Sequence, residues 1–285
     1  MLRGDLHTHT VASDGALSTP ALCQLAREEG LAVVAITDHD TVAGWPALGR
    51  TWPEVVGGVQ LTTTWQDQTL DLLGYYQELP EITNLLLLDL KAARQKRVEA
   101  MVRLLKEAGA DISDALPPAV ALADLGRPHL AQALVRAGHA ASVLDAFDRY
   151  LDKGRPGYVA RAELIPRDVI EAVHADRGLA VLAWRPEPIV EPLISLLLEW
   201  GLDGVEAYHP RATPQETLSL LDFADRHGLV VTAGSDFHRP EDGRLGVPSL
   251  AEERLLVFLA ALARRQMMAP TRDRLGAPGA EPEES

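Results

Sequence analysis

Histidine and aspartate side chains are concentrated in three short segments that lie far apart along the chain. These residues are His7, His9, Asp14, His39, Asp236 and His238. Imidazole nitrogens and carboxylate oxygens are the donors that bind ions such as Zn²⁺, Mn²⁺ and Mg²⁺ in proteins. A bound divalent ion can polarise a substrate oxygen and lower the pKa of a bound water. The three segments therefore predict a metal centre suited to hydrolysis.

The spacing of His7 and His9 places both imidazoles on one side of the chain if the segment is extended, because side chains of a strand repeat every second residue. Such a pair alone is a weak signal, and Asp14 or Asp40 could each be a turn or cap residue. The other two segments also follow apolar runs typical of strands. Since α/β folds place their sites at the carboxyl ends of strands, the three segments together favour metal binding.

Segments typical of strands alternate along the chain with segments typical of helices, and these elements would carry the residues above. Short apolar runs predict buried strands, and Pro near the start with Gly at the end marks helices. We expect strands at 31–36, 179–183, 203–207 and 229–233, and helices at 18–30, 165–178 and 213–228. The fold class is therefore α/β.

Residues from about 80 to 160 interrupt this alternation. They begin with one long helical pattern at 81–108 and continue with Ala- and Leu-rich helical segments. We interpret them as a helical insertion within a single domain spanning 1–268. Gly, Pro and Glu dominate the end of the chain, so 269–285 is predicted to be a disordered tail.

Composition narrows the classes of function. The chain has 285 residues, 47% hydrophobic and 24% charged, without a run near the ~18 apolar residues that a membrane helix needs. No secretory signal pattern precedes the first strand, so we expect a cytoplasmic location. The net charge of −14, with only four lysines, disfavours binding of extended nucleic acid. A single cysteine, Cys23, leaves His, Asp and Glu to form any metal site.

Five motifs resemble, in order and spacing, the PHP (polymerase and histidinol phosphatase) family of metal-dependent phosphoesterases. They are DLHTHTVASDG, ITDHDTVAGW, GYYQELP, GRPHLAQALV and GSDFH, and the resemblance covers essentially residues 1 to 250. It is closest to stand-alone enzymes with a helical insertion that act on nucleoside phosphates, 3′,5′-bisphosphonucleotides or short oligonucleotides. It implies a distorted seven-stranded (β/α) barrel with up to three metals at its C-terminal mouth.

The resemblance also implies the ligands of two metals. His7, His9 and Asp236 match the ligands of one ion, and Asp14, His39 and His238 match those of another. At three further ligand positions of the family, this chain has Gln60, Asp71 and Trp184. A Gln amide carries no negative charge to bridge two cations, and an indole offers no lone pair. We therefore expect one or two divalent ions per chain, of unspecified identity among Zn, Mn, Fe and Mg, and a third site that is weak or absent.

Several residues are candidates for contact with substrate. Arg127 and His129 match an active-site segment of the family and are predicted to be catalytic together with Asp14, which could be both ligand and proton acceptor. The substrate-binding candidates are Arg127, Trp184, Arg185, His209 and Arg211. Arginine binds phosphate through two parallel hydrogen bonds, and an indole can stack on a planar group. Glu206 and Arg211 could equally be packing or loop residues.

The leading hypothesis is metal-dependent hydrolysis of a small phosphorylated substrate, a nucleotide or short oligonucleotide. An amidohydrolase barrel also begins with His-x-His, but commonly uses a strand-borne lysine to bridge two metals. The lysines here, Lys91, Lys96, Lys106 and Lys153, all lie in the insertion or its flanks, which disfavours that class. A third reading is a degenerate PHP protein that binds metal and nucleotide with little or no turnover.

Overall fold

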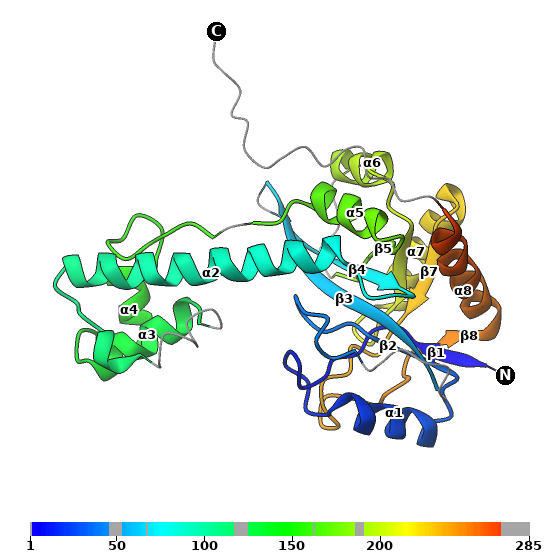
Figure 1. Ribbon diagram of the computed structural model, residues 1–285, viewed down its shortest axis with the longest axis horizontal. Coiled ribbons are helices and arrows are strands. Elements are labelled where there is room, and N and C mark those ends of the chain that lie inside the picture. The colour runs from blue at the N-terminus through cyan, green and yellow to red at the C-terminus, as the bar shows by residue number, and fades with distance from the viewer. Residues whose placement is uncertain are drawn as a thin grey trace, which may run out of the picture. The chain divides into compact units, whose positions relative to one another are not determined.

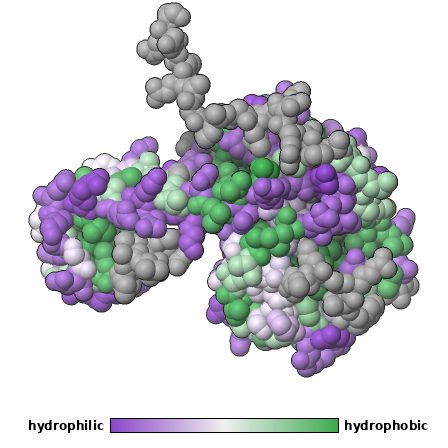
Figure 2. Space-filling model, in the orientation of Figure 1, coloured by the Kyte–Doolittle hydropathy of each residue, from purple (hydrophilic) through white to green (hydrophobic). Residues whose placement is uncertain are grey.

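The structure is a computed structural model that describes residues 2–45, 53–66, 68–116, 125–161, 163–185 and 191–268. It divides into two compact units, one formed by Met1–Asn84 with Leu164–Ser285 and the other by Leu85–Glu163 (Figure 1). The predicted tail, 269–285, lies outside the described residues. No helix of the described part of the chain is long and apolar enough to cross a membrane. Figure 2 shows hydrophilic residues over much of the visible surface.

The first unit contains one eight-stranded sheet with the strand order β7-β6-β5-β4-β3-β2-β1-β8. The strands are β1 (Arg3–Asp5), β2 (Val33–Ile36), β3 (Glu54–Trp65), β4 (Gln68–Tyr76), β5 (Leu179–Leu182), β6 (Gly204–Tyr208), β7 (Val230–Ala233) and β8 (Leu250–Ala251). Strands β2 and β5 are buried along their whole length. Such continuous apolar strands are typical of a sheet that is covered on both faces.

The sheet curls into a nearly closed barrel because the chain after β1 meets the chain after β7. The amide of Leu6 donates to the carbonyl of Ala233 at 2.9 Å, and Thr8 forms a parallel bridge with Phe237. Strand β8 pairs antiparallel with the first residues of β1. The seven strands β1 to β7 thus form the wall of the barrel. The predicted (β/α) barrel class is confirmed.

Close approach of the two closing strands requires a glycine. A Cβ atom on Gly234 would lie 2.1 Å from the Cβ of His7, closer than two carbon atoms can pack. Because Gly234 directly follows β7 and His7 follows β1, this contact sets how near the two metal-ligand segments come. The absence of a side chain at Gly234 therefore brings the predicted ligands of the two strands together.

The distortion of the barrel lies in β3 and β4, which form a long antiparallel hairpin. The register runs from Gly57 opposite Tyr76 to Trp65 opposite Gln68, and β4 is also antiparallel to β5. All other neighbours within β1 to β7 are parallel. The sequence analysis did not predict this hairpin, because β3 contains two adjacent glycines and lacks clean alternation of apolar and polar residues.

Among the described residues of this unit, five helices lie around the sheet (Figure 1). They are α1 (Thr19–Glu28), α5 (Pro166–Ala175), α6 (Glu191–Glu199), α7 (Pro214–His227) and α8 (Glu252–Met267). Helix α7 begins with a capping box in which Thr213 and Glu216 bond each other's backbone amides, and it ends at Gly228, whose φ of 64° is left-handed. The predicted helices 18–30, 165–178 and 213–228 correspond to α1, α5 and α7.

The second unit is helical. It contains α2 (Ile82–Glu107, which starts at the end of the first unit), a 3₁₀ turn (Ser113–Ala115), α3 (Arg127–Arg136), α4 (Val143–Ala146) and a π turn (Phe147–Leu151). Its core includes Met101 and Leu105 of α2 together with Leu130 and Leu134 of α3. These spacings of four residues place apolar side chains on one face of each helix.

Candidate metal centre

The six predicted metal ligands lie together where β1, β2 and β7 end. Two groups have donor atoms within 4.8 Å of one another: His9, Asp14, His39 and His238 form one, and His7, His9 and Asp236 form the other. Parallel strands bring their carboxyl ends to the same edge of a sheet, which explains why segments distant in sequence meet here. His9 belongs to both groups.

The spacing of the donor atoms fits metal coordination. In the group of His7, His9 and Asp236, Asp236 Oδ1 lies 3.5 Å from His7 Nε2 and 3.4 Å from His9 Nε2. In the group of His9, Asp14, His39 and His238, Asp14 Oδ1 lies 3.4 Å from His238 Nε2, and Asp14 Oδ2 lies 3.7 Å from His39 Nε2. Donors bound tetrahedrally at about 2.1 Å from an ion are about 3.4 Å apart. These contacts are therefore long for hydrogen bonds and suitable for ligands of one ion.

His9 provides the strongest single indication of metal binding. Its side chain is fully buried, and neither ring nitrogen has a hydrogen-bond partner among the described residues. A buried polar atom without a partner costs about 1–3 kcal/mol, so such atoms are rare. Burial lowers the pKa of His9 to about 4, with the charges of neighbouring histidines acting in the same direction. The ring is therefore neutral and offers one nitrogen lone pair to a cation.

His7 is held by a carboxylate that the sequence analysis left without a role. Its Nδ1 lies 2.9 Å from Oε1 of the buried Glu206, the arrangement that orients a ligand imidazole and strengthens its other nitrogen as a donor. Burial alone would lower the pKa of His7, but Glu206 and then Asp236 raise it to about 10. A proton and a cation therefore compete for Nε2. Contact between residues so distant in sequence cannot be read from local patterns.

Asp236 occupies a strained backbone position, with a φ of 51°. A left-handed non-glycine residue costs of order 1–3 kcal/mol and is common at functional sites. Burial would raise the pKa of its carboxyl, but the hydrogen bond from His209, the nearby imidazole of His9 and the charge of His7 hold that pKa well below its usual range. The carboxylate is thus ionised and ready to bind a cation.

Two further aspartates position the ligand segments. Asp38 accepts hydrogen bonds from the amide and hydroxyl of Thr10, both at 2.7 Å, and from the Ser13 hydroxyl at 2.6 Å, which fixes the loop before Asp14. The fully buried Asp5 accepts from the amides of His7 and Ser235 and thereby joins the first and last ligand segments. Burial raises the pKa of Asp5.

The three positions that depart from the family's pattern lie beside the predicted ligands. The Oε1 atom of Gln60 is 2.9 Å from His7 Nε2, and its Nε2 donates to Asp71 at 3.1 Å. The amide of Trp184 donates to Glu206 at 3.0 Å. Gln60, Asp71 and Glu206 thus form a hydrogen-bonded chain through His7.

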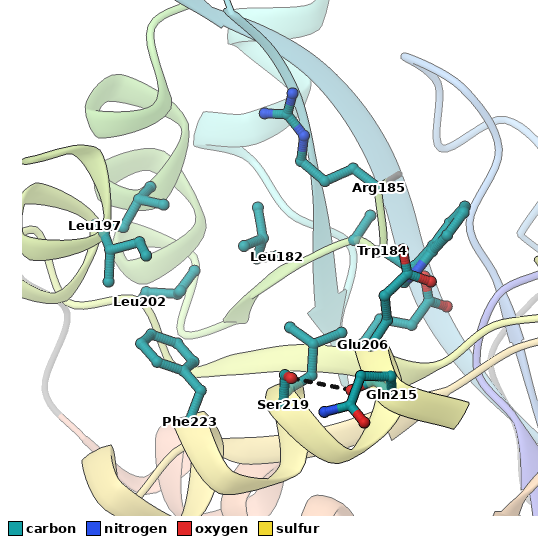
Figure 3. Close-up of a pocket in the computed structure, with 13 residues that line it drawn as sticks. Leu182, Trp184, Arg185, Leu197, Leu202, Glu206, Gln215, Ser219 and Phe223 are labelled. Carbon is teal, nitrogen blue, oxygen red and sulfur yellow. Dashed lines mark hydrogen bonds between the residues drawn. The ribbon is translucent and has the colours of Figure 1, made fainter. Parts of the chain in front are cut away.

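Among the substrate-binding candidates, His209 and Arg211 contact Asp236, and Trp184 contacts both of them. His209 Nε2 lies 3.3 Å from Asp236 Oδ2, and the exposed Arg211 guanidinium lies 3.5 Å from the same oxygen. Arg211 also lies over the ring of Trp184, 5.4 Å from its centroid. Trp184, Arg185 and Glu206 line a pocket of about 400 Å³ (Figure 3).

Arg127 and His129 lie at the start of α3, in the second unit. His129 Nδ1 accepts a hydrogen bond from the amide of Gly126 at 3.0 Å, which caps the helix. The guanidinium of Arg127 lies 5.8 Å from the ring centroid of Phe147. These contacts are internal to the unit, so catalytic roles for both residues remain predictions.

Comparison with known proteins identifies the family. The PHP domain family matches residues 5–109. A 5′-3′ exoribonuclease of Haemophilus influenzae is 34% identical over 252 residues, covering 83% of this chain and 90% of the relative. A 3′,5′-nucleoside bisphosphate phosphatase of Chromobacterium violaceum is 29% identical, covering 84% of this chain and 88% of the relative.

A solved structure agrees with these relatives. A protein of Bifidobacterium adolescentis, assigned as a metal-dependent phosphoesterase, superposes with a TM-score of 0.65 at 30% identity, covering 90% of this chain and 96% of the other. The family match at residues 5–109 includes His7, His9, Asp14 and His39 of the candidate ligands. The chain therefore belongs to the PHP family of metal-dependent phosphoesterases, which hydrolyse phosphoric esters.

Proposed function

We propose that this chain hydrolyses a phosphate ester of a nucleotide or short oligonucleotide, using two divalent ions held by the two ligand groups. The observation that carries the proposal is His9, a buried neutral imidazole whose two unpartnered nitrogens face Asp236 on one side and Asp14 on the other. A neutral imidazole has one lone pair, so His9 would bind one cation with one nitrogen and could donate its other N–H to the aspartate on the opposite side. The named activities of the exoribonuclease and phosphatase relatives support the substrate class.

In this proposal, the ligand groups, Asp14 and Arg211 have different roles in hydrolysis. Metal ions at the two groups supply Lewis-acid stabilisation of phosphoryl oxygens and a bound water of lowered pKa. Asp14, whose carboxylate is 56% exposed, can accept the proton of the attacking water at the mouth of the barrel. Arg211 is exposed beside Asp236 and can bind a phosphate oxygen that metals do not reach.

The third metal site is altered in this proposal. Gln60 contributes a neutral amide and already bonds His7 and Asp71, while Trp184 offers no donor to a cation. The Gln60–His7 contact also favours the second reading, a protein that binds metal and nucleotide with little turnover, since it competes with metal at His7 Nε2. Activity measurements separate the two readings.

Small substrates fit the charge of the chain better than long ones. A net charge of −14 opposes a long polyanion, whereas one or two phosphates can be held locally by cations. We expect weak binding of duplex RNA or DNA at physiological salt. Tight duplex binding under those conditions would contradict this part of the proposal.

The test is phosphate release from chain stripped of metal and reloaded with Mn²⁺, Zn²⁺ or Mg²⁺. The substrates are a 3′,5′-bisphosphonucleotide, a nucleoside 5′-monophosphate and a 5′-phosphorylated trinucleotide. We expect metal-dependent release that falls at least a hundredfold in His9→Ala and is unchanged in His227→Ala, an exposed histidine at the end of α7. Nucleotide binding without release would favour the degenerate reading, and full activity of His9→Ala would overturn the two-metal assignment.

A further inference from the structure

A pocket of about 400 Å³ opens beside the metal centre, between helices α6 and α7 and the ends of β5 and β6 (Figure 3). Its walls include Leu182 from β5, Leu197 from α6, and Leu220 and Phe223 from α7. Ligand sites of about 300–1,000 Å³ with mostly apolar walls are typical for small molecules. The dimensions and lining therefore suit a single planar ring system.

The pocket is connected to the metal centre by two side chains. Glu206 lines it and also holds His7 through the 2.9 Å contact to Nδ1. Trp184 lines it as well, and its ring is stacked on His209, which contacts Asp236. A ligand in this pocket would therefore lie one side chain, Glu206, away from His7, and two side chains, Trp184 and His209, away from Asp236.

The polar groups of the pocket are few and lie beside the apolar walls. Gln215 and Ser219 lie on an exposed face of α7, and Arg185 follows β5. The indole N–H of Trp184 is buried and has no acceptor among the described residues. A ring nitrogen or carbonyl of a heteroaromatic ligand would satisfy such a donor. An aliphatic ligand would leave the indole N–H unsatisfied.

We infer that this pocket binds the nucleobase of the substrate, while its phosphate lies at the metal centre. The inference rests on the proposed function and extends it, because it makes the base a source of specificity. Aromatic and apolar walls bind a base with little preference for its identity, since every base has a planar π-face. The pocket then distinguishes nucleotides from sugar phosphates that lack a base.

The experiment compares ligands with and without a base. Adenosine 5′-monophosphate and ribose 5-phosphate are titrated calorimetrically into the Mn²⁺-loaded chain, and phosphate release from both is measured in parallel. Ser219→Trp fills the pocket from an exposed position, so it carries little risk to folding. Leu218→Trp is the matched control, because Leu218 is also exposed on α7 but does not line the pocket.

We expect the wild-type chain and Leu218→Trp to bind the nucleotide at least tenfold more tightly than ribose 5-phosphate. In Ser219→Trp this difference should disappear, with affinity for ribose 5-phosphate unchanged. Equal affinity for the two ligands in wild type, or an undiminished preference in Ser219→Trp, would overturn the inference even if hydrolysis is normal.

Two further outcomes are distinguishable. If neither ligand is hydrolysed but the base-dependent difference in affinity persists, the proposed function fails and the pocket assignment stands. Sedimentation of the same variants tests whether the pocket is instead part of an interface between two copies of the chain. A wild-type dimer that becomes monomeric in Ser219→Trp, with nucleotide affinity unaltered, would show an interface and overturn the inference.

Discussion

The indole ring of Trp184 lies stacked on the imidazole of His209, with centroids 4.5 Å apart and planes inclined by 9°. The amide of Arg211 donates to His209 Nδ1 at 3.2 Å, so the neutral ring carries its proton on Nε2, which faces Asp236 Oδ2 at 3.3 Å. Trp184 therefore holds His209 in the orientation that donates to Asp236. Trp184, whose indole cannot bind a metal ion, thus acts through His209 on the candidate ligand Asp236.

The first prediction tests this positioning role. Trp184→Ala should lower the affinity for Mn²⁺ about tenfold, the order expected when a group that orients a ligand is lost. Trp184→Phe should retain most of the affinity, because a phenyl ring can still stack. Metal titration followed by calorimetry measures both. Unchanged Mn²⁺ affinity in Trp184→Ala, with a lowered melting temperature alone, would mean that the indole only packs against the barrel wall.

The second prediction concerns the number of bound ions. Elemental analysis of the wild-type chain should give fewer than three metals per chain, and the combined change His7→Ala with His9→Ala should remove them almost completely. This pair contributes to both ligand groups, and its loss would leave Asp14, His39 and His238 in one group and Asp236 alone in the other. Three tightly bound ions in wild type would contradict the altered third site. Retained metal in the double variant would contradict the ligand assignment.

The third prediction restores the ligand types that the family's pattern contains. Gln60→Glu, Asp71→His and Trp184→His together should raise the metal stoichiometry and the rate of phosphate release, since a carboxylate can bridge two cations and imidazoles supply lone pairs. Gln60→Glu alone removes the amide donor to Asp71 and places two carboxylates together, so it should be less effective than the triple change. Equal stoichiometry in wild type and triple variant would argue against a latent third site.

The fourth prediction concerns stability and pH. Asp203 is mostly buried, which by itself would raise its pKa, but His174 and Arg265 lower it below the ordinary value. A carboxyl with a lowered folded-state pKa stabilises the fold above its unfolded pKa of about 4 and loses that contribution as pH falls through the lowered value. Asp203→Asn should therefore cost about 3 kcal/mol at pH 7.

Thermal unfolding of Asp203→Asn and wild type across pH checks this sign. The difference in melting temperature should be largest at neutral pH and should shrink as the pH falls below about 4. Asp225→Asn, an exposed change on α7, is the control and should have little effect at any pH. A difference that grows on acidification would contradict the assignment of the ion pair.

Sequence patterns predicted the parts of this structure that depend on local chemistry. Thr213 before Pro214 and Gly228 after the apolar stripe mark the ends of α7 because capping and left-handed backbone need those residue types. The His7–His9 spacing predicted a shared face because side chains of an extended chain repeat every second residue. The ligand groups could be anticipated because strand ends of such barrels converge.

Other features depend on contacts that no local pattern specifies. The role of Glu206 arises only when β6 lies near β1, and the alignment of Gln60 with Asp71 arises from the register of an antiparallel hairpin. Asp38 looks like an ordinary residue after a strand, yet its two oxygens hold the loop that presents Asp14. These contacts depend on pairing between segments that are far apart in the sequence. Periodicity and capping rules describe only local structure and do not predict such pairing.

The seam of the barrel, where the chain after β1 meets the chain after β7, carries ligands on both of its sides. An ion bound by His9 and Asp236 would be a cross-link between the beginning and the end of the barrel sequence. Cross-links that close long loops reduce the conformational entropy of the unfolded chain more than those that close short ones. Bound metal would then stabilise the closed barrel as well as take part in catalysis. Removing it would first expose the seam amides of Leu6 and His9, which donate to Ala233 and Phe237, to exchange with solvent.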